Sequence, residues 1–222
     1  MHRHASTSSP PADSKSGHES IAEADSRCYD PGVVRLYLDH NATTPLAPPV
    51  RSAMLEALDA GWANASSVHH EGRQARAAVD TAREAVARLI GADPHEIIFT
   101  GSGTESDVAA LWGAAWAGEP SGRRRLIVAG LEHEAVLATA RHLARRGWPV
   151  TELPCEASGV VDPDALRALI TDDTAVVSVM HANNEVGTIQ PIAALASIAR
   201  AHGALFHTDA VQSAGKIPVD VS

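Results

Sequence analysis

Lysine and cysteine are both scarce in this sequence. Its 222 residues include 16 arginines but only two lysines, Lys15 and Lys216. The two cysteines, Cys28 and Cys155, lie far apart with no partner at metal-ligand spacing, so neither a disulfide framework nor a metal site is indicated. No stretch approaches the roughly 18 uncharged apolar residues of a membrane span, and the N-terminus lacks the apolar core of a signal peptide. We therefore expect a soluble, cytoplasmic protein without a membrane partner.

Positive charge is also in short supply. The chain has 27 acidic residues against 18 Lys and Arg, which gives a net charge of -9. Its longest basic run is Arg123 to Arg125. Binding to a nucleic acid backbone needs a broader positive surface than such a run provides. We expect no nucleic-acid partner.

The N-terminal residues 1–34 differ in composition from the rest of the chain. They are rich in Ser, His, Pro and Asp and poor in large apolar side chains, so they cannot bury enough surface to offset the entropy of ordering. We predict a disordered extension here and a folded domain over residues 35–222. Acidic residues such as Glu19 and Glu23 argue against an organelle transit peptide, in which acids are rare.

From residue 35 onward, short apolar runs alternate with helical patterns. The expected helices cover 49–62, 71–90 and segments that begin near Thr104, Glu134, Asp162 and Pro191. The expected strands are 97–99, 126–128, 150–153, 175–180 and 204–208. This alternation predicts an α/β fold, with a mostly parallel sheet covered by helices on both faces. Ligands of such sheets gather at the carboxyl ends of the strands.

A run of small residues, Thr100-Gly101-Ser102-Gly103-Thr104-Glu105-Ser106, follows the first expected strand. Small side chains let backbone N–H groups approach a ligand at a helix start, where the helix dipole favours a phosphate. The run is neither a Walker loop nor a dinucleotide fingerprint. An ordinary glycine turn with a Ser or Thr cap explains it equally well.

Polar side chains follow three further expected strands. His133, Asn184 and Asp209 each come after one, and Gln212 follows Asp209 closely. A carboxylate such as Asp209 at the end of a buried strand is costly without a cationic partner. Together with the glycine turn, these groups suit a ligand with a phosphate, a cationic ring nitrogen and a flat polar ring. Pyridoxal 5'-phosphate (PLP) has all three, and a phosphosugar or nucleotide is the alternative.

Six motifs in order make the pattern more specific. They are Tyr37-Leu38-Asp39-His40-Asn41-Ala42-Thr43-Thr44-Pro45, Asn64-Ala65-Ser66-Ser67-Val68-His69, Gly103-Thr104-Glu105-Ser106, Glu132-His133-Glu134-Ala135-Val136, Met180-His181-Ala182-Asn183-Asn184-Glu185-Val186-Gly187 and His207-Thr208-Asp209-Ala210-Val211-Gln212. From about Leu36 onward the chain resembles the cysteine desulfurases, class V members of the fold type I PLP-dependent enzymes. The resemblance implies that fold's large domain, here incomplete. One departure is Ala65, where the family usually has proline.

The resemblance also implies roles for individual residues. Gly103 and Thr104 would bind the cofactor phosphate, and Asp209 would pair with the pyridine nitrogen. Asn184 and Gln212 would contact the ring hydroxyl or the amino-acid end of the substrate.

Two further roles follow from the same resemblance. His133 would stack on the pyridine ring and assist proton transfer as a catalytic residue. Asn41 would lie near the substrate entrance.

The activity implied by the resemblance is PLP-dependent removal of sulfur from L-cysteine. It produces L-alanine and an enzyme persulfide, whose sulfur passes to an acceptor or scaffold protein for iron–sulfur clusters or thio-modification. The full-length form would be a homodimer. The alternatives are a selenocysteine lyase or another class V lyase, and a non-catalytic remnant that binds a partner or dimerises.

Some groups that this chemistry needs have no counterpart in the sequence. The family's Schiff-base lysine lies in a Ser-x-His-Lys segment, which neither Lys15 nor Lys216 matches. The persulfide cysteine and a carboxylate-binding arginine belong to the same missing part, and Cys155 does not align with that cysteine. We therefore expect this chain to be roughly the N-terminal half of a desulfurase, inactive on its own.

Overall fold

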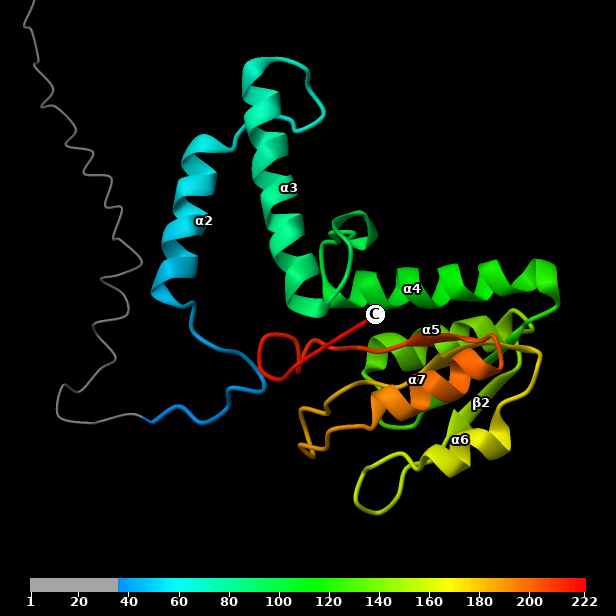
Figure 1. Cartoon of the computed structure of the whole chain (residues 1–222). Helices are drawn as coiled ribbons and strands as arrows, with labels where there is room; N and C mark the ends of the chain where they lie inside the picture. The colour runs from blue at the N-terminus through cyan, green and yellow to red at the C-terminus, as the bar shows by residue number, and fades with distance from the viewer. Residues whose placement is uncertain (1–35) are drawn as a thin grey trace, which may run out of the picture. The chain divides into compact units, whose positions relative to one another are not determined.

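The computed structural model describes residues 36–222 (Figure 1). The expected N-terminal extension, with Lys15 and Cys28, lies outside the described residues. The chain divides into two units, residues 1–40 and 41–222. In the described end of the first unit, the rings of Tyr37 and His40 meet edge to face with centroids 5.0 Å apart. The candidate site belongs to the second unit.

Helices and strands alternate through most of the second unit. Its helices are α2 (Pro48–Ala60), α3 (His70–Ile90), α4 (Gly103–Gly118), α5 (Glu134–Arg145), α6 (Pro163–Leu169), α7 (Ile192–Ala201) and the short 3-10 helices η2 (Pro94–Glu96) and η3 (Glu119–Ser121). Its strands are β1 (Arg125–Ala129), β2 (Val150–Leu153), β3 (Thr174–Ser178) and β4 (Leu205–His207). Among the described helices, none combines the length and apolar character needed to cross a membrane.

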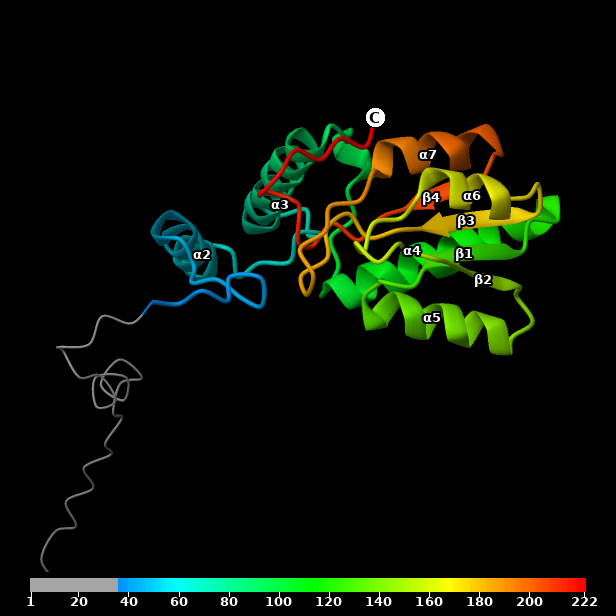
Figure 2. The same ribbon diagram turned by 90° about the horizontal axis from the view of Figure 1, so that it is seen from below.

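The four strands form one parallel sheet in the order β2-β1-β3-β4. Side chains alternate between its two faces, so Leu126 and Val128 pack with α4 and α5, whereas Ile127 packs with α6 and α7. Figure 2 shows the sheet between these two helix pairs. The predicted parallel sheet with helices on both faces is confirmed.

Two expected elements differ from the structure. The segment 97–99 is not a strand, since Ile98 is 82% exposed and no strand in the described part of the chain pairs with it. The expected helix at 49–62 is present as α2, but the side chains of its apolar stripe, such as Met54 and Leu58, are exposed. Both segments have the apolar pattern of a buried element, yet most of their large apolar side chains are exposed.

Helix boundaries follow local signals in the sequence. The hydroxyl of Ser102 accepts a hydrogen bond from the Glu105 amide (3.2 Å) at the start of α4. The Asp162 carboxylate accepts from the Asp164 amide (2.9 Å) at the start of α6. Gly91 ends α3 with φ of 72°, a left-handed conformation that glycine adopts without strain.

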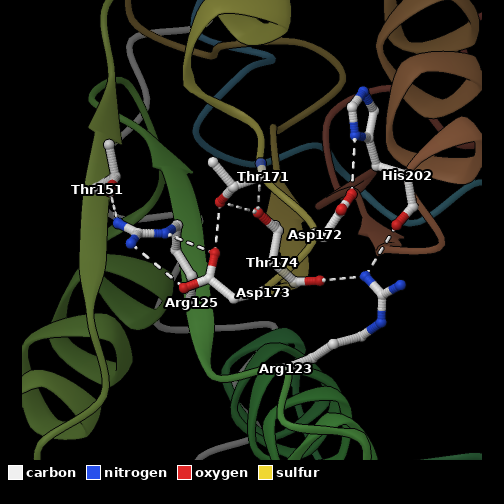
Figure 3. Close-up of polar contacts among 8 residues, drawn as sticks. All are labelled: Arg123, Arg125, Thr151, Thr171, Asp172, Asp173, Thr174 and His202. Carbon is white, nitrogen blue, oxygen red and sulfur yellow. Dashed lines mark hydrogen bonds and ion pairs between the residues drawn. The ribbon is translucent and has the colours of Figure 1, made fainter.

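Two arginines organise the end of the sheet where β1 and β3 begin (Figure 3). Nη1 of Arg123 donates to the carbonyl oxygens of Thr174 (3.1 Å) and His202 (2.8 Å), which joins β3 to the end of α7. Arg125 forms a two-pronged contact with Asp173 through Nε (3.1 Å) and Nη2 (3.3 Å). The hydrogen bond from Arg125 lowers the pKa of Asp173 below its ordinary value.

Gly203 follows α7 at a crowded position. Its φ is 67°, and a Cβ added there would lie 2.8 Å from Nη2 of Arg123. Gly147, with φ of 85°, follows α5 in open space. We expect Gly147→Ala to cost about 1 kcal/mol through backbone strain alone. Gly203→Ala should cost about 1–2 kcal/mol more because Arg123 must move away from its carbonyl partners. Urea unfolding of both variants measures the difference, and equal losses would show that Arg123 moves at no cost.

Candidate functional site

The N-terminus of α4 forms one side of the candidate site. Gly103 and Thr104 are its first residues, and both are exposed. Backbone amides in the first turn of a helix have no partner within the helix, and the Ser102 hydroxyl takes only that of Glu105. The remaining amides can bind an anion. A Cβ on Gly103 would lie 3.2 Å from Cγ2 of Val211, so glycine lets α4 come close to the segment after β4.

Asp209 lies on that segment and is only 9% exposed. Its Oδ1 accepts a hydrogen bond from the Val211 amide (2.9 Å), and its backbone carbonyl accepts from the His181 amide (2.9 Å). The second oxygen, Oδ2, takes no hydrogen bond within residues 36–222. It can therefore accept from a positively charged donor, which a buried carboxylate needs.

His133 is an exposed residue at the N-terminal cap of α5. Its Nδ1 accepts a hydrogen bond from the Ala135 amide (3.1 Å). Since Nδ1 is an acceptor, the proton of the neutral ring lies on Nε2. The ring therefore presents a donor to the surface and can exchange a proton there.

Three predicted site residues, Asn41, Asn184 and Gln212, lie together although they are far apart in the sequence. Nε2 of Gln212 donates to the Asn41 carbonyl (3.1 Å), and Nδ2 of Asn41 lies 3.5 Å from the Asn184 carbonyl. Lys216 donates to Oε1 of Gln212 (3.1 Å). The exposed side chain of Asn184 stays available to a ligand.

Asn183 has a structural function that the sequence did not reveal. Its Oδ1 accepts from the amides of Glu185 (2.8 Å) and Val186 (3.0 Å), and its Nδ2 donates to the Leu131 carbonyl (3.1 Å). This side chain holds the turn after β3 against the loop before α5. The sequence shows two adjacent asparagines, Asn183 and Asn184, but it does not indicate which of the two side chains faces inward.

The sequence also did not reveal a cluster of buried polar side chains close to these residues. The Ser178 hydroxyl lies 2.8 Å from Oε1 of Glu132 and 2.9 Å from Nδ1 of His207, and Nε2 of His207 lies 3.5 Å from Asp107. Burial raises the pKa of Glu132 from 4.5 to about 7, against the lowering effect of the Ser178 hydrogen bond. For Ser178 and His207 the sequence signal was a polar residue in an otherwise apolar strand, whereas Asp107 lies in α4 and Glu132 in the loop before α5.

A cavity of about 760 Å³ lies beside α7, lined by that helix and by residues 218–222. None of the seven predicted site residues lines this cavity. His181 does, and its buried Nδ1 has no hydrogen-bond partner among the described residues. Burial lowers the pKa of His181, which favours its neutral form. The predicted site residues therefore form a site separate from this cavity.

The arrangement at the strand ends combines three chemical capabilities. It has open amides for an anion at Gly103 and Thr104, a buried carboxylate for a cation at Asp209, and an exposed imidazole at His133. Within residues 36–222, no group of three His, Cys, Asp or Glu side chains is placed to hold a metal ion. The open amides and the buried carboxylate suit a ligand with charges of both signs.

Known proteins are similar to this chain in both sequence and fold. Cysteine desulfurase IscS of Dictyoglomus turgidum is 47% identical over 186 residues, which cover 84% of this chain and 47% of that relative. A solved NifS-like protein superposes with a TM-score of 0.80 at 39% identity, covering 85% of this chain and 52% of that one. A structure described as SspA in complex with cysteine superposes with a TM-score of 0.79 at 37% identity, covering 84% of this chain and 54% of that one.

The resemblance inferred from the motifs is confirmed by these matches. The chain spans about half the length of the curated relatives it matches. A family profile described as Aminotransferase class-V matches residues 36–222, which are most of the chain. The chain therefore belongs to the aminotransferase class-V family.

Proposed function

We propose that this chain supplies the cofactor-binding part of a PLP-dependent cysteine desulfurase. The observation that carries the proposal is the close approach of Gly103 to Val211, at 3.2 Å for an added Cβ. It brings the open amides of α4 beside the segment that carries Asp209. One small ligand with a phosphate and a protonated ring nitrogen, as in PLP, can satisfy both groups.

Each part of the site has a function in this proposal. The first-turn amides of α4 would hold the phosphate, and Asp209 would pair with the ring nitrogen and keep it protonated. PLP, when bound, supplies an electron-withdrawing ring that stabilises negative charge developing on the substrate. His133 would lie near the ring and could hold or move a proton at Nε2, because its Nδ1 accepts from the Ala135 amide.

The substrate assignment rests on the relatives. Those at 46–47% identity are cysteine desulfurases, and one solved relative is described as a complex with cysteine. We propose L-cysteine as the substrate, with Asn41, Asn184 and Gln212 near its amino-acid end. An acceptor protein for the sulfur, a homodimer and a cytoplasmic location are further parts of the proposal that rest on the family resemblance. So does the division into an N-terminal extension, 1–34, and a domain, 35–222.

A chimera tests the proposed function. This chain would be continued by the C-terminal half of the Dictyoglomus turgidum relative, with which it shares 47% identity. We expect the chimera to bind PLP, with a yellow absorbance, and to release L-alanine from L-cysteine. The chain alone should release none, because neither of its lysines matches the Schiff-base lysine.

Three results would change the proposal. Alanine production by the chain alone would show that its own residues complete the chemistry. A folded chimera without PLP would contradict the cofactor assignment. Turnover of selenocysteine but not cysteine would favour the lyase alternative.

A further inference from the structure

Four side chains below the proposed cofactor site form a continuous polar chain. Ser178 is at its centre, with its hydroxyl 2.8 Å from Oε1 of Glu132 and 2.9 Å from Nδ1 of His207. On the far side of the imidazole, Nε2 lies 3.5 Å from Oδ1 of Asp107. Glu132, Ser178 and Asp107 are buried, and the side chain of His207 is only 13% exposed. We call these four residues the buried network.

Each end of the buried network is close in sequence to a residue of the proposed cofactor site. Asp107 lies on α4, one turn after Thr104. Glu132 immediately precedes His133, and His207 precedes Asp209 on the same strand end. The network therefore joins the phosphate-binding helix, the imidazole loop and the carboxylate segment through one set of contacts.

The charge state of Glu132 determines how these contacts can form. The charged or titratable groups that act on it are His207, Asp209 and Asp107, and burial raises its pKa to about 7. Its Oε2 is buried without a hydrogen-bond partner among the described residues. A negative charge on this side chain is thus poorly compensated, and the acid form is present up to neutral pH.

In the acid form, every contact of the buried network has a donor and an acceptor. Glu132 donates its proton to the Ser178 oxygen, and the Ser178 hydroxyl donates to Nδ1 of His207. The imidazole proton then lies on Nε2 and faces the Asp107 carboxylate.

Loss of the Glu132 proton to solvent reverses the direction of the hydrogen bonds from Glu132 through Ser178 to His207. An ionised Glu132 only accepts, so the Ser178 hydroxyl must donate to it. Ser178 has no second proton, so Nδ1 of His207 must carry one and donate to the Ser178 oxygen. In the neutral ring this leaves the bare lone pair of Nε2 facing the Asp107 carboxylate, which weakens the link to α4.

We propose that the buried network positions α4 relative to Asp209, and that the proton on Glu132 sets the direction of its hydrogen bonds and thereby the affinity of the cofactor site. This inference rests on the proposed function for the identity of the ligand. Glu132 and Ser178 are positioning residues, which act on the ligand through the segments that they hold.

The first test measures PLP affinity of the 222-residue chain by fluorescence titration at pH 6 and pH 8.5. Between these pH values, affinity should fall about fivefold more in the wild type than in Glu132→Gln, whose amide donates to Ser178 at both. Titration of PLP itself affects both proteins equally. Glu134→Gln, a change at an exposed carboxylate nearby, should behave as the wild type. Equal pH dependence of wild type and Glu132→Gln would overturn the proposal.

The second test needs no cofactor. Side-chain nitrogen NMR of the same proteins reports which nitrogen of His207 carries the proton, with His207→Gln identifying the signal. In the neutral ring of His207 we expect the proton to move from Nε2 to Nδ1 in the wild type as Glu132 loses its proton, and to stay on Nε2 in Glu132→Gln. An unchanged tautomer in the wild type would overturn the network. Absence of PLP binding by the wild type together with the expected tautomer change would instead count against the proposed cofactor.

Discussion

Asp209→Asn is expected to weaken PLP binding about a hundredfold. The asparagine side chain has nearly the same shape, and its oxygen can still accept from the Val211 amide, as Oδ1 does at 2.9 Å. What it removes is the negative charge opposite the proposed ring nitrogen. Breaking a buried charge pair costs about 3–5 kcal/mol. Because this site is open to water on one side, we expect a loss at or slightly below the lower end of this range, which corresponds to about a hundredfold in affinity. Fluorescence titration of PLP into wild type and variant measures the ratio.

The control for this substitution is Asp164→Asn. Asp164 is an exposed residue in the first turn of α6, so the same chemical change there leaves the candidate site untouched. Its PLP affinity should equal that of the wild type. If Asp209→Asn also bound PLP as the wild type does, Asp209 would not be the partner of the ring nitrogen.

The order of helices and strands could be predicted because each element carries its own signal. Apolar runs such as Leu126-Ile127-Val128 gave the strands of the sheet, and Asp162-Pro163 and Gly91 marked helix ends. The segment 97–99 carries the same signal but is no strand, because a strand also needs a neighbour with free backbone groups. The pattern of apolar residues indicates which side of a segment can be buried, but it does not indicate which other segment packs against it.

The sequence indicated which polar residues lie near the carboxyl edge of the sheet, but it did not indicate the buried network. Residues such as His133 and Asp209 follow β1 and β4 closely, and the parallel sheet brings strand ends to one edge. The contact of Ser178 with Glu132 and His207 joins three segments at one depth in the sheet. That depth depends on the register, which places Val128 beside Ser178 and Ser178 beside His207. Sequence spacing alone does not contain this information.

Glu132 also determines how stability should vary with pH. Its pKa is about 7 in the folded chain against 4.5 as the ordinary value, so the folded state binds this proton more tightly than the unfolded state. The stabilisation is fully present below pH 4.5 and is lost as the pH rises through 7. Asp173 has the opposite sign, because its lowered pKa gives stability that is lost as the pH falls.

We therefore expect the free energy of unfolding of the wild type to fall, relative to Glu132→Gln, by roughly 3 kcal/mol between pH 4.5 and pH 8. Both proteins contain Asp173 and every other titrating group, so these contributions cancel in the difference. Urea unfolding at several pH values measures it, and Glu134→Gln, at an exposed carboxylate, should follow the wild type within about 0.5 kcal/mol. Parallel curves for wild type and Glu132→Gln would mean that Glu132 titrates in the folded chain as it does in water, and that its burial without a partner at Oε2 carries no cost.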